Sequence, residues 1–131
     1  MILGIGMDSV ETIRFAHWHR YSVHQLTSLF SPEEIRWCLQ HTVKSAERFA
    51  VRFAVKEAFF KALSVMTPTH GHSLRSLCKK VRLTSLASVP HLEVDWNAIL
   101  PPHTLSLKTH VSLTHTARTA SAVVIIEQLL P

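Results

Sequence analysis

The sequence predicts an α+β fold in which an antiparallel sheet packs against one long helix and several shorter helices. An apolar, alanine-rich stretch from Arg48 to Leu63 favours a helix, whereas the C-terminal half alternates polar and apolar residues as half-buried strands do. No internal repeat, low-complexity tract or linker interrupts the 131 residues. We therefore expect one domain over residues 1–131.

The N-terminal third predicts a strand and two helices. The apolar run "MILGIGM" is typical of a buried strand that ends at Asp8, and Gly4 and Gly6 leave room for a neighbouring backbone. Part of the following stretch, residues 9–30, reads as a short amphipathic helix. The "SPEE" segment then predicts a helix that starts at Ser31 with a capping box and proline in its first turn, and runs toward Gln40.

The longest element is predicted next. Thr42 or Ser45 can cap a helix that extends to about Met66 and stops before Pro68. Four later segments predict strands because they alternate or are rich in β-branched residues, namely 79–86, 91–96, 104–116 and 121–130.

Composition limits the class of protein. Hydrophobic residues make up 47% and charged residues 18%, which indicates a globular chain. No apolar run approaches the ~20 residues of a bilayer span, and the N-terminus lacks signal-peptide features, so we expect a cytoplasmic protein without a membrane partner. The net charge of +5 favours an anionic partner, and by charge alone nucleic acid, an anionic membrane, an acidic protein or a phosphorylated cofactor would qualify.

Charged residues on the long helix fall on two sides. Basic residues recur every four positions along one side of the helix and form a basic ridge. Glu57 and Lys61 lie roughly on the opposite side, among alanines and phenylalanines suited to burial. The ridge consists of Lys44, Arg48, Arg52 and Lys56.

Glu57 and Lys61 admit two interpretations. A surface ion pair one turn apart would add only ~0.2–0.5 kcal/mol to helix stability. Partly buried charges are costly without compensation, which a cation on Glu57 and a phosphate on Lys61 would supply. Because Mg²⁺ prefers one or two carboxylates with phosphate and water oxygens, Asp8 is the natural second ligand.

A third polar group lies in "HVSLTHT", residues 110–116. In a regular strand His110, Ser112 and Thr114 share one face, while His115 lies on the other face with Val111 and Leu113. A histidine beside two hydroxyls could bind a phosphate or a ribose. A solvated polar face explains the same pattern.

Three separated stretches together resemble the holo-acyl-carrier-protein synthases, the small bacterial 4′-phosphopantetheinyl transferases. They are "GIGMDSVE" (4–11), "RFAVRFAVKEAFFKAL" (48–63) and "HVSLTHT" (110–116). The resemblance implies transfer of phosphopantetheine from coenzyme A to a serine of apo-acyl-carrier protein, which releases 3′,5′-ADP and serves fatty acid biosynthesis. In place of the family's Gly-rich and Gly-Lys-Pro-like turns this chain has "SVMTPTHGHS" and "DWNAILPPHTLSL".

The resemblance also implies roles for single residues. Asp8, Glu57 and Lys61 would be catalytic: the two carboxylates would hold Mg²⁺, and Lys61 would stabilise the phosphate charge. Either Glu57 or a metal-polarised water would take the serine proton. Coenzyme A would contact Lys61, Arg48, Arg52, His110, Ser112 and Thr114.

The resemblance implies partners as well. Arg14 and Arg20, on the expected first helix, would dock the acidic carrier protein. The chain would form a homotrimer with active sites between subunits.

Two other functions compete with this one. A basic module that binds RNA or DNA would need stacking aromatic side chains, but only 8% of the residues are aromatic and the phenylalanines have helical core spacing. An inactive carrier-binding relative would have no use for Asp8, Glu57 and Lys61 together. We therefore expect an enzyme that does not bind nucleic acid.

Overall fold

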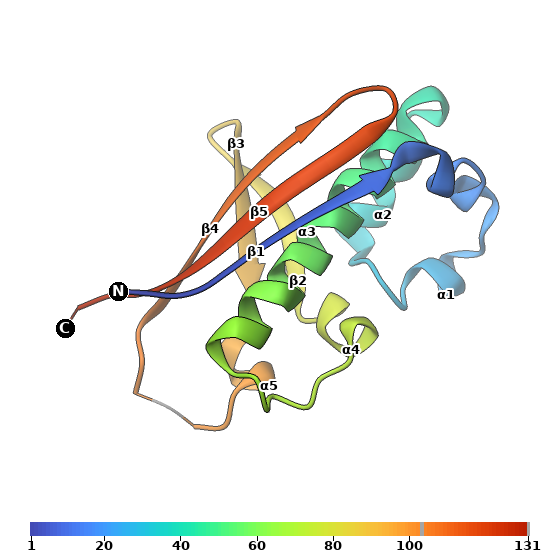
Figure 1. Cartoon of the computed structure of the whole chain (residues 1–131). Helices are drawn as coiled ribbons and strands as arrows, with labels where there is room; N and C mark the ends of the chain where they lie inside the picture. Colours follow the sequence, from blue (N-terminus) through green and yellow to red (C-terminus); the bar gives the residue numbers. More distant parts are fainter. Residues whose placement is uncertain (103, 131) are drawn as a thin grey trace.

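The computed structural model describes residues 1–102 and 104–130, and it has the expected α+β architecture (Figure 1). The strands are β1 (Ile2–Glu11), β2 (Val81–Leu86), β3 (Val89–Val94), β4 (Leu107–His115) and β5 (Thr119–Gln128). The helices are α1 (Val23–Leu26), α2 (Pro32–Leu39), α3 (Ser45–Met66), α4 (Leu74–Cys78) and α5 (Trp96–Ile99). Short 3₁₀ helices span Thr12–Phe15, Trp18–Arg20 and Thr42–Lys44.

The main sheet has three antiparallel strands in the order β1-β5-β4, and α3 runs along one of its faces (Figure 1). Alternate residues of β5 face the helix and form the core, as in Ala122, Val124 and Ile126, all of which are buried. The opposite face is open within the chain. Ile5 and Met7 of β1 are exposed there by 54% and 69%.

Glycine brings β1 into close contact with α3. A Cβ on Gly4 would collide with the carbonyl oxygen of Ala62, and one on Gly6 would collide with that of Ala58. The small residues of both elements therefore allow their backbones to touch, as the sequence predicted. This contact fixes the distance between β1 side chains and those of α3.

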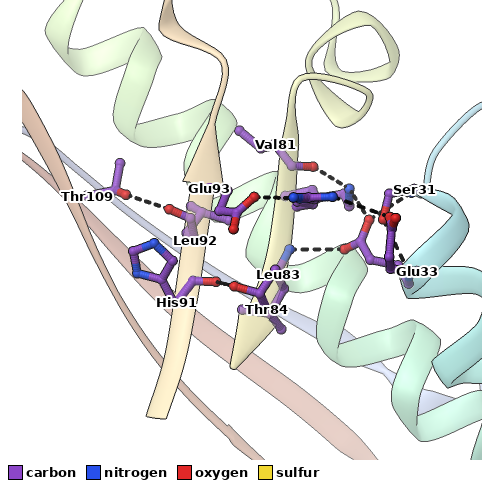
Figure 2. A network of polar contacts seen from close by, with 12 residues as sticks. Ser31, Glu33, Val81, Leu83, Thr84, His91, Leu92, Glu93 and Thr109 are labelled. Atoms are coloured by element: carbon purple, nitrogen blue, oxygen red, sulfur yellow. Dashed lines mark hydrogen bonds and ion pairs between the residues drawn. The ribbon is translucent and has the colours of Figure 1, made fainter. Parts of the chain in front are cut away.

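The β2–β3 hairpin is tied to its neighbours by polar contacts, which Figure 2 shows from close by. The Leu83 backbone N–H donates to Glu34 Oε2 of α2 at 3.2 Å, and Thr109 Oγ1 of β4 donates to the Leu92 carbonyl of β3 at 3.0 Å. The hairpin is thereby held between α2 and the edge strand of the main sheet.

The predicted basic ridge does not include Lys56 as an accessible charge. It is almost completely buried, and its Nζ donates to Glu34 Oε1 at 2.8 Å and to two backbone carbonyls, Cys78 at 2.8 Å and Val81 at 2.7 Å. Lys56 therefore joins α2, α3 and the start of β2. The helical spacing is as predicted, but α2 and α4 cover this end of the ridge, which the pattern of a single helix does not reveal.

Several element boundaries also differ from the prediction. β1 continues past Asp8, which therefore lies inside the strand. Residues 12–26 form two 3₁₀ helices and the one-turn α1 in place of a single amphipathic helix. β3 ends at Val94, because the Asp95 side chain caps α5 by accepting from the Ala98 N–H at 3.3 Å. The "SPEE" capping box is confirmed at the start of α2.

Two further points concern the described part of the chain. Cys38 and Cys78 are both buried and free. None of the helices in that part has the length and apolar character of a bilayer span.

Candidate active site

Asp8 is the most enclosed of the predicted catalytic residues. It follows Gly4 and Gly6 at alternate positions of β1, so its side chain faces α3, and only 9% of that side chain is exposed. Oδ1 accepts from Lys61 Nζ at 3.1 Å, and the same amine donates to the Met7 carbonyl at 3.1 Å. Oδ2 is buried and has no hydrogen-bond partner among the described residues.

Glu57 lies one turn before Lys61 on α3 and next to Asp8. The pKa of Glu57 is raised to about 7. Burial is the larger cause, and the Asp8 carboxyl, which can accept a hydrogen bond from protonated Glu57, is the second. The positive charges of Arg14 and Lys61 act in the opposite direction. Near neutral pH Glu57 is thus partly protonated.

Lys61 pairs differently from the prediction. The structure pairs it with Asp8 across the β1–α3 contact instead of with Glu57 along the helix, and 54% of its side chain is exposed. The amine therefore remains accessible to a ligand at the rim of the site. Glu57 and Lys61, the two charged residues among the apolar residues of α3, therefore form a cluster with Asp8 of β1.

The cluster is suited to a divalent cation. When both carboxyl groups are ionised, Lys61 pairs with only one of them, and Asp8 keeps a buried oxygen without a partner among the described residues. Among the described residues, no group of three or more His, Cys, Asp or Glu side chains converges, so the protein would supply at most these two carboxylates here. A pair of carboxylates suits Mg²⁺, which completes its coordination with water and phosphate oxygens.

Arg48 and Arg52 lie in a separate groove of about 330 Å³, whose lining also includes Lys44 and His115. Arg52 is largely buried, its Nε has no hydrogen-bond partner in the described chain, and burial lowers the pKa of its guanidinium. An anion in the groove would compensate these positive charges. The predicted pairing of Arg48 and Arg52 with phosphate thus has a cavity to accommodate it.

His110, Ser112 and Thr114 share one face of β4, as the alternation predicted. That face is the open side of the sheet, away from α3 and hence away from the Asp8 cluster. His110 Nε2 lies 2.9 Å from Glu127 Oε1 of β5. Within one chain, the structure does not bring these three residues to Arg48, Arg52 or Lys61.

His115 belongs to the groove, although the sequence did not single it out for a ligand. Its Nδ1 lies 2.8 Å from Glu47 Oε1 of α3, and it lines the cavity with Arg48 and Arg52. The signal was present in the alternation, because His115 shares the helix-facing side of β4 with Val111 and Leu113.

Arg14 and Arg20 are both exposed, but they lie on two 3₁₀ helices beyond the end of β1 (Figure 1). The Arg14 guanidinium carbon is 4.8 Å from the centre of the Phe53 ring of α3. The Arg14 charge also acts to lower the pKa of Glu57, against the larger effect of burial.

Comparisons with known proteins cover nearly the whole chain. A model of the 4′-phosphopantetheinyl transferase superfamily matches residues 4–119. A holo-[acyl-carrier-protein] synthase of Treponema denticola is 38% identical over 128 residues, 97% of this chain and 99% of that protein. One of Treponema pallidum is 39% identical over 131 residues and covers 97% of each chain.

Solved structures show the same fold. The acyl carrier protein synthase of Mycobacterium tuberculosis superposes with a TM-score of 0.69 at 27% identity, over 98% of this chain and 100% of that one. The likeness extends over the segments that supply Asp8, Glu57 and Lys61.

Proposed function

The chain belongs to the 4′-phosphopantetheinyl transferase superfamily, and from this premise we propose that it transfers phosphopantetheine from coenzyme A to a serine of apo-acyl-carrier protein. The family and the transferase class expected from the sequence are confirmed. The proposed reaction depends on Mg²⁺ and yields holo-carrier protein and 3′,5′-ADP. Its proposed place is fatty acid biosynthesis.

One observation carries the catalytic part of the proposal. Asp8 has a buried oxygen without a partner among the described residues, next to a glutamate whose pKa is raised to about 7 and a lysine whose amine reaches the same carboxylate. Such a cluster is unfavourable when both carboxyl groups are ionised, because the lysine pairs with only one of them. A cation between the carboxylates and a phosphate at the amine would relieve it.

The proposed roles follow from these positions. Asp8 and Glu57 would hold Mg²⁺, which when bound neutralises phosphate charge and polarises water. Lys61 directs its amine at the oxygens of the transferred phosphate, where charge grows as the bond to 3′,5′-ADP breaks. Arg48 and Arg52 bind phosphates of coenzyme A. With its raised pKa, Glu57 is suited to accept a proton near pH 7, so it remains a candidate base for the carrier serine.

We expect excess chelator to stop transfer and Mg²⁺ to restore it. Mass spectrometry of an apo carrier protein incubated with coenzyme A measures this. Calorimetry of Mg²⁺ binding gives a second readout: affinity should rise through pH 7 with release of a proton, because Glu57 must ionise to bind the cation. Undiminished transfer in chelator would remove the cation from the mechanism.

Arg14→Glu should raise the KM for the carrier protein severalfold, because reversing an exposed charge weakens attraction to an acidic surface. Its effect on the KM for coenzyme A should be smaller. Steady-state kinetics at several salt concentrations measure both, since screening should reduce the difference. Arg36→Glu is the matched control, because it changes the net charge equally at an exposed position on α2. Equal carrier kinetics for the two variants would exclude Arg14 as a docking residue.

We also propose a homotrimer with active sites between subunits. The open face of the main sheet supports it, since Ile5 and Met7 are exposed there beside Val123 and Ile125 of β5. His110, Ser112 and Thr114 share that face, so a neighbouring subunit is the way they could approach a bound coenzyme A. The single-domain organisation over 1–131, the cytoplasmic location, Arg20 in carrier docking and the absence of nucleic-acid and membrane partners stay predictions.

A further inference from the structure

Two half-buried histidines hold the segment that joins α3 to α4. His70 Nε2 lies 3.1 Å from Ser64 Oγ of α3, and His70 Nδ1 accepts from the His72 backbone N–H at 2.8 Å. His72 Nε2 lies 2.7 Å from the Ile99 carbonyl oxygen of α5. The two imidazole rings stack with their centres 5.6 Å apart, and the Phe60 ring of α3 packs edge-on against His70. These contacts form a continuous chain from the end of α3 to α5.

The neighbours of each ring determine where its proton lies. The Ile99 carbonyl can only accept, so His72 Nε2 carries a hydrogen. The Ser64 hydroxyl donates to the Phe60 carbonyl at 2.8 Å, which leaves its oxygen to accept from His70 Nε2. His70 is therefore neutral with its hydrogen on Nε2, and its Nδ1 keeps the lone pair to which the His72 N–H donates.

This arrangement opposes a second proton on His70. The proton would have to bind Nδ1, at which the His72 N–H already points. Burial, and then the charge of His72, lower the pKa of His70. His72 is the one charged group of the described chain that contributes to this shift, because α3 presents the uncharged Phe60 and Ser64 to the ring and α5 contacts the pair through the Ile99 carbonyl.

We propose that His70 and His72 form a latch that is closed near neutral pH and opens when His70 takes up a proton, which releases residues 67–73 from α3 and α5. The latch joins the two segments in which the chain departs from the family's turns, since His70 and His72 lie in "SVMTPTHGHS" and Ile99 lies in "DWNAILPPHTLSL". Ser64 is three residues after Lys61 on α3, so the two side chains lie on the same side of the helix, one turn apart. The latch therefore makes the end of α3 next to Lys61 sensitive to acid.

Hydrogen exchange of the His72 amide, followed by NMR, measures the opening. The closed latch excludes the second proton, whereas the open latch takes it up with an ordinary histidine pKa of about 6.5. We therefore expect the exchange rate, corrected for its intrinsic dependence on pH, to rise about tenfold from about pH 7.5 to about pH 5.5. The stability that the latch contributes is complete above a pH of about 6.5 and is lost as the pH falls through the lowered pKa of His70.

His70→Asn separates the titration of this ring from other effects of acid. Asparagine offers an amide oxygen to the His72 N–H and does not titrate, so the corrected exchange rate should be the same at both pH values. His24→Asn is the matched control, because it removes an exposed histidine of α1 and should keep the tenfold response of the wild type.

Three results would overturn the inference. The first is a wild-type rate that does not change with pH, and the second is an equal rise in His70→Asn, which would assign the response to another group. The third is an equal rise for the amides of β5, which would indicate that the whole fold opens. Nitrogen chemical shifts of the His70 ring give a separate check, because a neutral ring with its hydrogen on Nδ1 would contradict the closed latch. None of these measurements uses transfer activity, so they remain informative if the proposed function fails.

Discussion

We expect Lys61→Met to keep cation binding and to lower kcat by ~10²–10³-fold, while Glu57→Gln loses Mg²⁺-dependent transfer. Lys61 reaches the Asp8 carboxylate and the rim of the site, so its amine can meet charge that develops on the substrate phosphate. Removing such a preorganised charge raises the barrier by roughly 3–4 kcal/mol. Glu57→Gln removes a cation ligand. The measurements are kcat for carrier modification and Mg²⁺ binding by calorimetry.

The two variants separate catalysis from stability. A surface ion pair would change the free energy of unfolding by a few tenths of a kcal/mol and leave transfer intact. Arg36→Met is the reference variant for a surface ion pair, because Arg36 and Glu33 form an exposed pair on α2. Thermal melts of all three variants therefore separate a loss of transfer from a loss of stability. If kcat of both Lys61→Met and Glu57→Gln stayed near wild type, the catalytic assignment would be wrong.

The sequence predicted those features of the fold and the site that depend on the residue pattern within a single helix or strand. The capping box of α2, the length of α3 and the shared face of His110, Ser112 and Thr114 all follow from local rules and are confirmed. Such features need only the neighbours within a turn or along a strand.

Features that depend on contacts between distant elements were missed. Lys56 was grouped with the basic ridge because nothing in α3 shows that its partner is Glu34, 22 residues earlier. Lys61 was paired with Glu57 because one turn of helix brings them together, yet Asp8, 53 positions away, accepts its hydrogen bond. The β2–β3 turn also lacks its usual sequence signal: Ala87 and Ser88 have positive φ, whereas turns of this kind usually carry Asn or Gly at such positions.

Resemblance and geometry contributed differently to the site. The family motif identified Asp8, Glu57 and Lys61, and the structure brings these three residues together. The residues assigned to coenzyme A were harder to predict, because the groove draws Trp37 from α2, Arg48 from α3 and His115 from β4. Sequence spacing cannot show that three separate elements line one cavity.

The second large effect is expected at Gly6. Gly6→Ala should lower the free energy of unfolding by about 3 kcal/mol or more, because the new Cβ would meet the Ala58 carbonyl oxygen. A backbone atom of a long helix cannot turn aside as a flexible side chain can, so β1 and α3 must separate. Chemical denaturation of the variant and the wild type measures the difference.

Separation of β1 from α3 should also impair the site, because Asp8 lies two residues after Gly6 on the same face of the strand. We expect Mg²⁺ binding to weaken in molecules of Gly6→Ala that remain folded. Gly71→Ala is the matched control: Gly71 has a φ of +75° and no atom within 4 Å of the point that a Cβ would occupy, so alanine there meets only the backbone penalty of about 1–2 kcal/mol. It should leave Mg²⁺ binding unchanged. A Gly6→Ala variant no less stable than Gly71→Ala, with normal cation binding, would show that the β1–α3 contact does not hold Asp8 beside Glu57.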